Sequence, residues 1–386
     1  MSMTLQVQDF LDMEENLLII YNPQWRILGY FGFLPVDYHD PAKTFKKASY
    51  PLCCFRACIT AVMIIGQLFM VYVIGGLFVF RMMAPSAGMA GGSYNNMVLK
   101  VLEMLPYVMM AFRSLCVMVV LLAKRRHCEP LRAETIAFFR TCFHGFLPRT
   151  RQAQRWSLLA IVMCSVSFVL HFSWDILQLY EYAARIQYDM ELDSGLIYPR
   201  ISVRVYFILW AVFVSVPYFL SQQVYSWALI SAAILSSTLK SLKEQIRKEY
   251  TAVIKCGKGH LPLQQLSDKV TTWQTAHMEM LRFCQSLEHF FSWILFFIYC
   301  CDFAILLGYT AGFVNHIHEE GWLRKNIAEF GYAVLIFASY GTVFAIPFVR
   351  VYERSSGLLF DLHELTLVVK QFTGKESCGV IMIKFV

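Results

Sequence analysis

The sequence predicts an all-α, polytopic membrane protein, and two observations predict this fold class: an apolar composition and a series of long runs without charge. Of the 386 residues, 57% are hydrophobic, 16% are aromatic and only 16% are charged. Soluble domains usually carry about 25% charged residues. A helix that spans a bilayer needs about 20 predominantly apolar residues, and runs of about this length recur along the chain. Both observations indicate a bundle of membrane-spanning helices.

Six runs predict six transmembrane helices. Four of them contain no Asp, Glu, Lys or Arg, and these cover residues 57–80, 156–174, 205–239 and 330–349. The other two runs are less uniform, because each contains a charged residue well inside it. One covers about residues 97–123 and contains Arg113, and the other covers about residues 290–312 and contains Asp302.

The fourth run is longer than a bilayer requires. A helix over residues 205–239 would reach roughly 50 Å at about 1.5 Å per residue, whereas the hydrocarbon core of a bilayer is about 30 Å thick. The charged segment 240–249 follows this run, and apolar residues recur at helical spacing from Trp273 to Phe291 before the fifth run begins. We therefore expect helices 4 and 5 to extend beyond the lipid and to pack as a cytosolic collar.

These runs divide the chain into five segments. We expect residues 1–51 to form a cytosolic segment at the membrane surface and residues 52–238 to contain helices 1 to 4. Residues 239–288 should form the collar, and residues 289–350 should contain helices 5 and 6. Residues 351–386 should form a cytosolic amphipathic helix that leads into the start of a seventh span. Residues 17–34 are too apolar for a free tail. They predict either a helix or hairpin on the inner membrane surface or a short helix packed on the collar.

Lysine and arginine residues predict the orientation of the chain. They concentrate in residues 26–56, 124–155 and 240–282 and are sparse in the alternate loops. Cytosolic loops carry such an excess, so we expect a multi-pass plasma-membrane protein with a cytosolic N-terminus and no signal peptide before the first span. The 12 cysteines then lie in spans or on the cytosolic side, which suits a reducing compartment. The formal charge of +7 fits basic loops facing anionic membrane lipid, and we expect no nucleic-acid partner.

A small-molecule site is expected in the outer half of the bundle. Aromatic side chains with a few polar groups are the usual lining of a ligand pocket. Aromatic residues also serve as interfacial anchors and packing residues, so the sequence leaves both interpretations open. The residues concerned are Tyr107, His171, Trp174, Gln178, Trp210, Phe213, Tyr218 and Tyr332.

Arg113 and Asp302 are the two charges placed well inside predicted spans. An isolated charge in the bilayer is costly, and the two lie at similar depth, so we expect them to pair. The pair is either an element of gating or permeation or a structural ion pair. The sequence contains no catalytic motif, no cofactor-binding loop and no Cys pairing of the zinc-binding kind. We therefore expect no enzymatic activity, no cofactor and no metal.

Four stretches resemble the arthropod odorant and gustatory receptor superfamily, including its nematode gustatory-like relatives. They are the segment before helix 1, the end of helix 4, the helix that enters helix 5, and a stretch after helix 6 that is more similar to the gustatory branch. In the sequence these are Trp25–Pro35, Leu235–Leu242, Trp273–Phe291 and Val351–Leu362. The predicted cytosolic N-terminus and the extended fourth and fifth helices are similar to that family as well.

The resemblance implies a chemosensory receptor subunit that forms a homotetramer or heterotetramer with related subunits. In that family a small molecule binds in the outer half of each subunit and opens a cation channel whose pore is lined by a seventh helix. Here only the short apolar stretch Cys378–Ile383 follows the amphipathic helix. This departs from the family pattern, and a non-conducting, truncated receptor isoform is therefore an alternative.

Two other classes of membrane protein are weighed against this interpretation. A seven-helix G-protein-coupled chemoreceptor predicts an extracellular N-terminus, an extracellular disulfide and an Asp-Arg-Tyr-like triplet after helix 3, and the sequence shows none of these features. A transporter predicts broken helices in two related halves, and the sequence shows no internal repeat.

Overall fold

The computed structural model describes most of the chain, and this part is almost entirely helical. It covers residues 20–21, 23–33, 36–39, 44–47, 50–83, 94–142, 155–166, 168–169, 172–173, 203–256, 263–320 and 325–373. The exception to helix is an antiparallel hairpin of β1 (Val36–His39) and β2 (Thr44–Lys47), in which Val36 lies opposite Lys47. The predicted all-α class is confirmed apart from this hairpin, which was not predicted and lies just after the segment 17–34, where a helix or hairpin was expected.

The named helices follow one another with few interruptions. They are α2 (Tyr50–Met83), α3 (Tyr94–Ala123), the 3₁₀ turn η2 (Arg125–His127), α4 (Cys128–Cys142), α6 (Val203–Trp210), the π-helical turn η3 (Ala211–Ser215), α7 (Val216–Cys256), α8 (Leu263–Glu320) and α9 (Lys325–Thr373). Residues 23–30 and 155–166 are helical as well.

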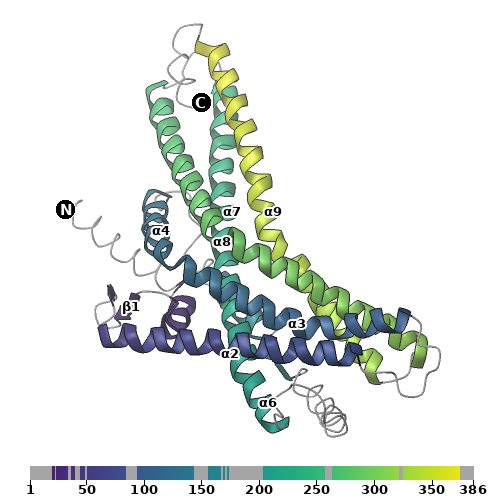
Figure 1. Ribbon diagram of the computed structural model, residues 1–386. Helices are drawn as coiled ribbons and strands as arrows, with labels where there is room; N and C mark the ends of the chain where they lie inside the picture. Colours follow the sequence, from purple (N-terminus) through teal and green to yellow (C-terminus); the bar gives the residue numbers. More distant parts are fainter. Residues whose placement is uncertain are drawn as a thin grey trace.

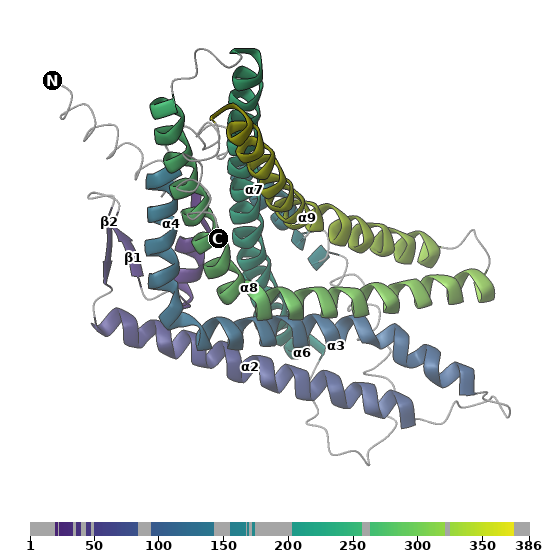
Figure 2. The same cartoon turned by 90° about the horizontal axis from the view of Figure 1, so that it is seen from above.

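The helices form a layer and a column (Figures 1 and 2). In the layer, α2 lies along α3, and α3 packs along the second half of α8. In the column, α7 packs against the second half of α9 and stands beside the first half of α8. Both α8 and α9 change direction between the two parts, so each of them contributes to the layer and to the column.

The changes of direction in α8 and α9 have local causes. Pro347 lies inside α9, where it removes a backbone donor and crowds the preceding turn. Near the middle of α8, the Lys124 ammonium donates a hydrogen bond to the backbone carbonyl of His289. A side chain that engages a carbonyl of the helical ladder is a recognised cause of a kink. Lys124, which directly precedes η2, thus contacts α8 at the place where the layer meets the column.

Four helices in the described part of the chain are long and apolar enough to cross a membrane. Their apolar segments are Pro51–Gly76, Leu105–Ala123, Ile208–Ala252 and Lys269–Val314. They coincide with predicted spans 1, 2, 4 and 5. Of predicted span 3, the shorter apolar helix Arg155–Val166 is described, and predicted span 6 lies within α9. Six spans and their orientation remain predictions, whereas a helical membrane protein is supported directly.

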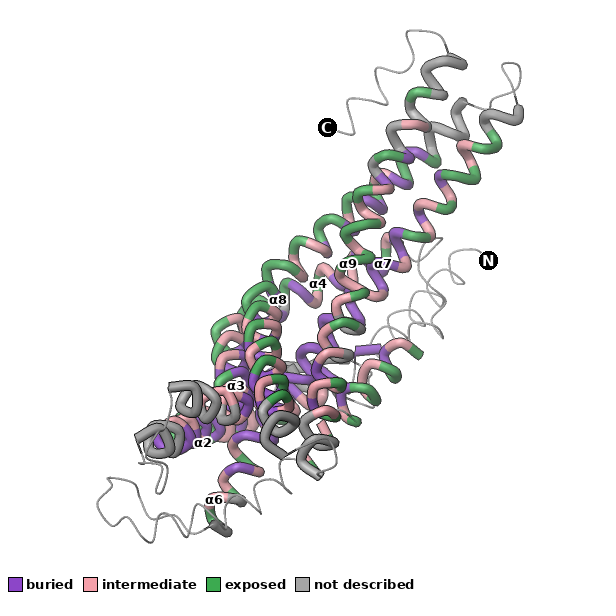
Figure 3. Tube along the Cα trace, turned by 90° about the vertical axis from the view of Figure 1, so that its right-hand side faces the viewer, coloured by how far each residue is buried: buried purple, intermediate pink, exposed green. Residues whose placement is uncertain are grey.

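The outward faces of these helices are apolar. On α2, Val62, Ile65, Phe69 and Tyr72 recur at helical spacing and are all exposed, Ile65 to 66%. Exposed positions alternate with buried ones along α8 and α9 as well (Figure 3). In water such a surface would favour aggregation, whereas lipid tails are as apolar as these side chains. The exposed faces therefore fit a bilayer as solvent.

Beyond the apolar part of α7, polar contacts hold the column together. Asp361 of α9 is 8% exposed and forms ion pairs with Lys243 at 3.5 Å and with Arg247 at 3.1 Å, both on α7. Close by, Arg354 Nη1 donates to the Ser236 carbonyl at 2.7 Å. The sequence led us to expect the extensions of helices 4 and 5 to pair. In the structure, α7 contacts α9 more extensively than it contacts α8.

The start of the described chain is docked into the bundle. Tyr21 and Trp25 stack with ring centroids 5.4 Å apart, and Trp25 meets Trp227 of α7 edge to face at 5.9 Å. Gly32 has φ +79, and a Cβ on it would lie 2.7 Å from the Arg56 carbonyl oxygen. Only glycine fits that turn without strain. These contacts dock the segment on α2 and α7, at residues outside the predicted collar 239–288.

Candidate functional site

Three of the predicted ligand-binding residues come together in one aromatic cluster. Trp210, at the end of α6, is 2% exposed, and its ring meets that of Tyr107 from α3 with centroids 6.2 Å apart and planes at 64°. Phe213 of η3 packs on α2, where a Cβ on Gly66 would lie 2.1 Å from the Phe213 ring. A glycine is thus required for α2 to approach this closely. The rest of the cluster is apolar and includes Met70, Ile74, Ala111 and Val214.

The indole of Trp210 has a hydrogen-bond donor that no described residue uses. Its Nε1 is buried, and no acceptor for it lies within the described residues. A buried donor without a partner costs about 1–3 kcal/mol, and such groups in native structures call for an explanation. An acceptor atom of a bound small molecule would supply one. The cluster therefore combines apolar aromatic walls with a polar group that could orient a ligand.

The π-helical turn η3 begins directly after Trp210. It spans Ala211–Ser215, and α7 continues from Val216. A π-helical turn holds one extra residue and is found frequently at functional sites. Here it sets the direction of Trp210 relative to the side chains of α7. It also carries Phe213 into the aromatic cluster.

Tyr218 of α7 lies in a second cluster of buried side chains. It is buried together with Met110, Ile305, Tyr309, Ala333 and Phe337, which come from α3, α8 and α9. The two clusters are neighbours, because Met110 belongs to one and Ala111 to the other. Tyr332 is 40% exposed and is not among the buried residues of either cluster. His171, Trp174 and Gln178 lie outside the described residues.

Arg113 and Asp302 form an ion pair within the bundle. Arg113 Nε lies 3.2 Å from Asp302 Oδ1, and the side chains are 0% and 11% exposed. The guanidinium also lies over the Tyr218 ring, 4.7 Å from its centroid. A cation over an aromatic face is attracted by the ring quadrupole. The pair expected from the depth of the two charges is present, and it touches one of the predicted ligand-binding residues.

Further polar groups extend this ion pair into a layer across α2, α3, α7 and α8. Tyr225 of α7 donates to the hydroxyl of Tyr299 on α8 at 2.9 Å. Next to Arg113, the Ser114 hydroxyl accepts a hydrogen bond from Gln67 Nε2 at 2.8 Å. Polar groups inside a membrane bundle are costly and mark functional paths. These contacts join α2 to α3 and α7 to α8, beside the ion pair that joins α3 to α8.

Sequence reasoning found some of these groups and missed others. Charges in apolar runs identify Arg113 and Asp302, and aromatic character identifies Trp210 and Tyr218. The η3 turn carries no sequence signal, because Ala-Val-Phe-Val-Ser reads as ordinary apolar helix. Gln67 is a polar residue within the apolar run 57–80. Its polarity could have predicted a hydrogen bond to a neighbouring helix.

No metal centre is formed by the described residues, since no three His, Cys, Asp or Glu side chains in them lie close enough to share an ion. The chain was also compared with known proteins. No protein-family model matches the sequence, and no curated protein matches it significantly.

Proposed function

We propose that the chain is a chemosensory receptor subunit of the gustatory type, in which a small molecule gates a cation channel. The observation that carries the proposal is the position of the Trp210 indole. A buried aromatic cluster, with a donor that no described residue uses, is joined through η3 to Tyr218, over whose ring the buried Arg113 of the ion pair lies. This arrangement provides a place for a ligand and a route from that place to the charged centre of the bundle. The resemblance to the odorant and gustatory receptor superfamily supports the same function.

In the proposed mechanism the ligand shifts an existing equilibrium. A small molecule in the aromatic cluster accepts a hydrogen bond from Trp210 and contacts Tyr107 and Phe213. The resulting change in η3 is passed to Tyr218, which holds the Arg113 guanidinium over its ring. A ligand can favour the open state only by binding it more tightly than the closed state. The ion pair is then the element whose two arrangements distinguish closed from open.

The remaining features of the proposal concern assembly and placement. We propose a homotetramer or heterotetramer with related subunits in the plasma membrane, with a cytosolic N-terminus and with membrane lipid and a small-molecule ligand as partners. The column of α7, α8 and α9 would then lie in the cytosol as the collar. Its polar contacts at Asp361 and Arg354 are of the kind that a water-facing helical extension uses. No catalytic step is proposed.

The test is the ligand response of Trp210→Phe. This change keeps an aromatic ring and removes the indole N–H together with the rest of the fused five-membered ring. We expect the concentration of an activating compound that gives half-maximal current to rise about tenfold, because one lost hydrogen bond is worth about 1.4 kcal/mol. Whole-cell currents from cells that express the full chain, with any required co-subunit, would be recorded against a panel of sugars, bitter alkaloids and volatile organic compounds.

Trp293→Phe is the matched control, because Trp293 is 57% exposed on α8 and lies outside the aromatic cluster. Surface expression of both variants would be measured by biotinylation. Unchanged responses of Trp210→Phe to every activating compound would remove the indole from the site and contradict the proposal.

A further inference from the structure

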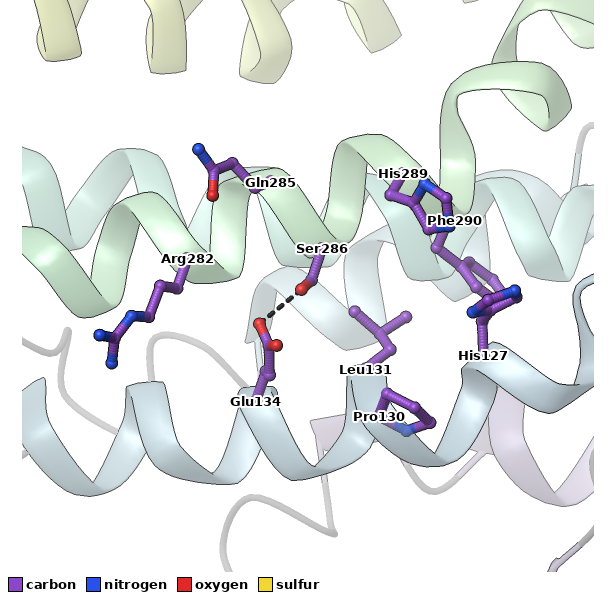
Figure 4. Close-up of a pocket in the computed structure, with 9 residues that line it drawn as sticks. All are labelled: His127, Pro130, Leu131, Glu134, Arg282, Gln285, Ser286, His289 and Phe290. Atoms are coloured by element: carbon purple, nitrogen blue, oxygen red, sulfur yellow. Dashed lines mark hydrogen bonds between the residues drawn. The ribbon is translucent and has the colours of Figure 1, made fainter.

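A cavity lies away from the aromatic cluster, where α4 packs against the first half of α8 (Figure 4). It has a volume of about 290 Å³ and is lined by His127, Pro130, Leu131, Glu134, Arg282, Gln285, Ser286, His289 and Phe290. Polar groups occupy the walls, whereas Leu131 and Phe290 are buried at 3% and 1% exposure. The cavity therefore combines an apolar floor with a polar rim.

The charge pattern along the helices predicts that the cavity lies at the depth of lipid headgroups. The apolar segment of α3 ends at Ala123, and the basic residues Lys124, Arg125 and Arg126 follow at once. On α8, a run without charge begins at Phe290. The apolar segment of α3 thus ends at this level, and α8 carries no charge from Phe290 until Asp302. A phospholipid meets its protein partners with its headgroup at the same boundary.

One end of the cavity presents hydrogen-bond donors. The rings of His127 and His289 meet edge to face with centroids 5.1 Å apart, and both lie on the right in Figure 4. Each imidazole carries an N–H, and a protonated one carries two. With Lys124 bonded to the His289 carbonyl and two arginines next in sequence, this end suits a phosphate.

The middle of the cavity presents a carboxylate. Glu134 of α4 accepts a hydrogen bond from the Ser286 hydroxyl of α8, as the dashed line in Figure 4 shows. A carboxylate has about four acceptor positions, so this bond leaves capacity for another donor. A purely anionic ligand would be repelled by Glu134. A ligand that carries a primary ammonium a few ångströms from its phosphate would match both groups.

We propose that this cavity binds a phosphoethanolamine group, the headgroup of phosphatidylethanolamine, with the phosphate at His127 and His289 and the ammonium at Glu134. Arg282 takes a lesser part, because its Nη1 lies 2.7 Å from Glu279 and its side chain is 63% exposed. The glycerol and the acyl chains would leave over Phe290 toward the apolar surface. A choline headgroup has no N–H to donate to Glu134, and a glycerol headgroup has no positive charge.

The test uses the full chain purified in a nonionic detergent. The protein is incubated with equal amounts of phosphatidylethanolamine, phosphatidylcholine and phosphatidylglycerol that have the same acyl chains, and the lipid retained after gel filtration is quantified by mass spectrometry. We expect retention of phosphatidylethanolamine at least about tenfold above the other two, as one charge-assisted hydrogen bond provides. Equal retention of the three lipids by the unaltered chain would overturn the proposal.

Variants identify the cavity as the place of binding. Glu134→Gln keeps an acceptor for Ser286 and removes the charge, and we expect it to abolish the preference for phosphatidylethanolamine over phosphatidylcholine. Glu288→Gln is the matched control, because Glu288 is an exposed residue of α8 that does not line the cavity. Glu134→Gln with the preference intact, or Glu288→Gln with an equal loss, would overturn the assignment.

Soluble phosphoethanolamine distinguishes the two sources of this headgroup. If millimolar phosphoethanolamine displaces the retained lipid, the cavity recognises the group itself, from a lipid or from solution. If the lipid stays while Glu134→Gln still loses it, the acyl chains contribute and the ligand is the membrane lipid. Both results support the site.

Discussion

At the scale of single residues, the ion pair of Arg113 and Asp302 is buried and held by more than one contact. Both charges are removed from solvent, at 0% and 11% exposure, and Arg113 also stacks on Tyr218. A buried pair adds little net stability compared with apolar residues of the same size, whereas loss of one partner leaves an uncompensated charge. Substitutions of Arg113 and of Asp302 should therefore be strongly coupled in their effect on the free energy of unfolding.

We expect Asp302→Leu alone to lower the free energy of unfolding by about 3–5 kcal/mol. Arg113→Met alone should cost a similar amount. The double variant should cost much less than the sum, because neither charge is then left alone. Thermal unfolding of the detergent-solubilised chain, followed by fluorescence-detected gel filtration, measures all three. Additive losses would show that the pair is not coupled.

At the scale of elements, the η3 turn between α6 and α7 determines which side chains face the aromatic cluster. Its extra residue shifts the register of everything before it by about 100°, the rotation per residue of a helix with 3.6 residues per turn. Trp210 lies before the turn and Tyr218 after it. The relative direction of the two side chains therefore depends on a single residue.

Deletion of Val212 tests this dependence. Val212 is 41% exposed, so its side chain contributes little packing, and its removal should convert η3 into regular α-helix. We expect the chain to reach the cell surface and to lose its ligand response, since Trp210 would leave the cluster. Val212→Ala keeps the register and should respond as the unaltered chain does. A deletion variant with a normal response would show that the turn does not orient Trp210.

We expect Asp361 to stabilise the packing of α7 against α9. Asp361 is buried and holds Lys243 and Arg247, although Arg247 is 64% exposed and so contributes less. We expect Asp361→Asn to lower the free energy of unfolding of the column by about 1 kcal/mol. Glu244→Gln is the control, because its pair with Lys240 is 57% and 61% exposed on the two side chains and should contribute almost nothing.

Native-state proteolysis of the purified chain, followed against urea, gives both values. Equal sensitivity of Asp361→Asn and Glu244→Gln to the protease would show that Asp361 stabilises the column no more than an exposed charge does.

At the scale of the whole molecule, the sequence predicts the helices better than their partners. Charge-free runs predict the spans, because moving a charged side chain from water into lipid is unfavourable in free energy at each position. The pairing of α7 with α9 was not predicted, because helical periodicity identifies the apolar face of a helix and does not identify its neighbour. Arg113 and Asp302 are the exception, since a charge in lipid requires a partner and only two lay deep in the runs.

The orientation of the chain is a prediction of the same scale. The excess of Lys and Arg in the loops predicts that an epitope tag before Met1 is reached by antibody only after the cells are permeabilised. A tag after Val386 reports the side on which the chain ends. The two tags would be compared in intact and permeabilised cells, with an extracellular tag on another receptor as the control. Staining of the N-terminal tag in intact cells would contradict the predicted orientation.

Close packing between α3 and α8 also limits how the bundle can move. A Cβ on Gly308 would lie 2.6 Å from Pro106 Cδ and 2.7 Å from the Leu102 carbonyl oxygen, an oxygen that Pro106 leaves without its usual helical donor. If α8 slid by one residue, Leu307 or Tyr309 would have to enter a space that only glycine fits. The contact therefore acts as a pivot: α8 can tilt about Gly308, whereas sliding along α3 or rolling about its own axis would bring a side chain into the contact.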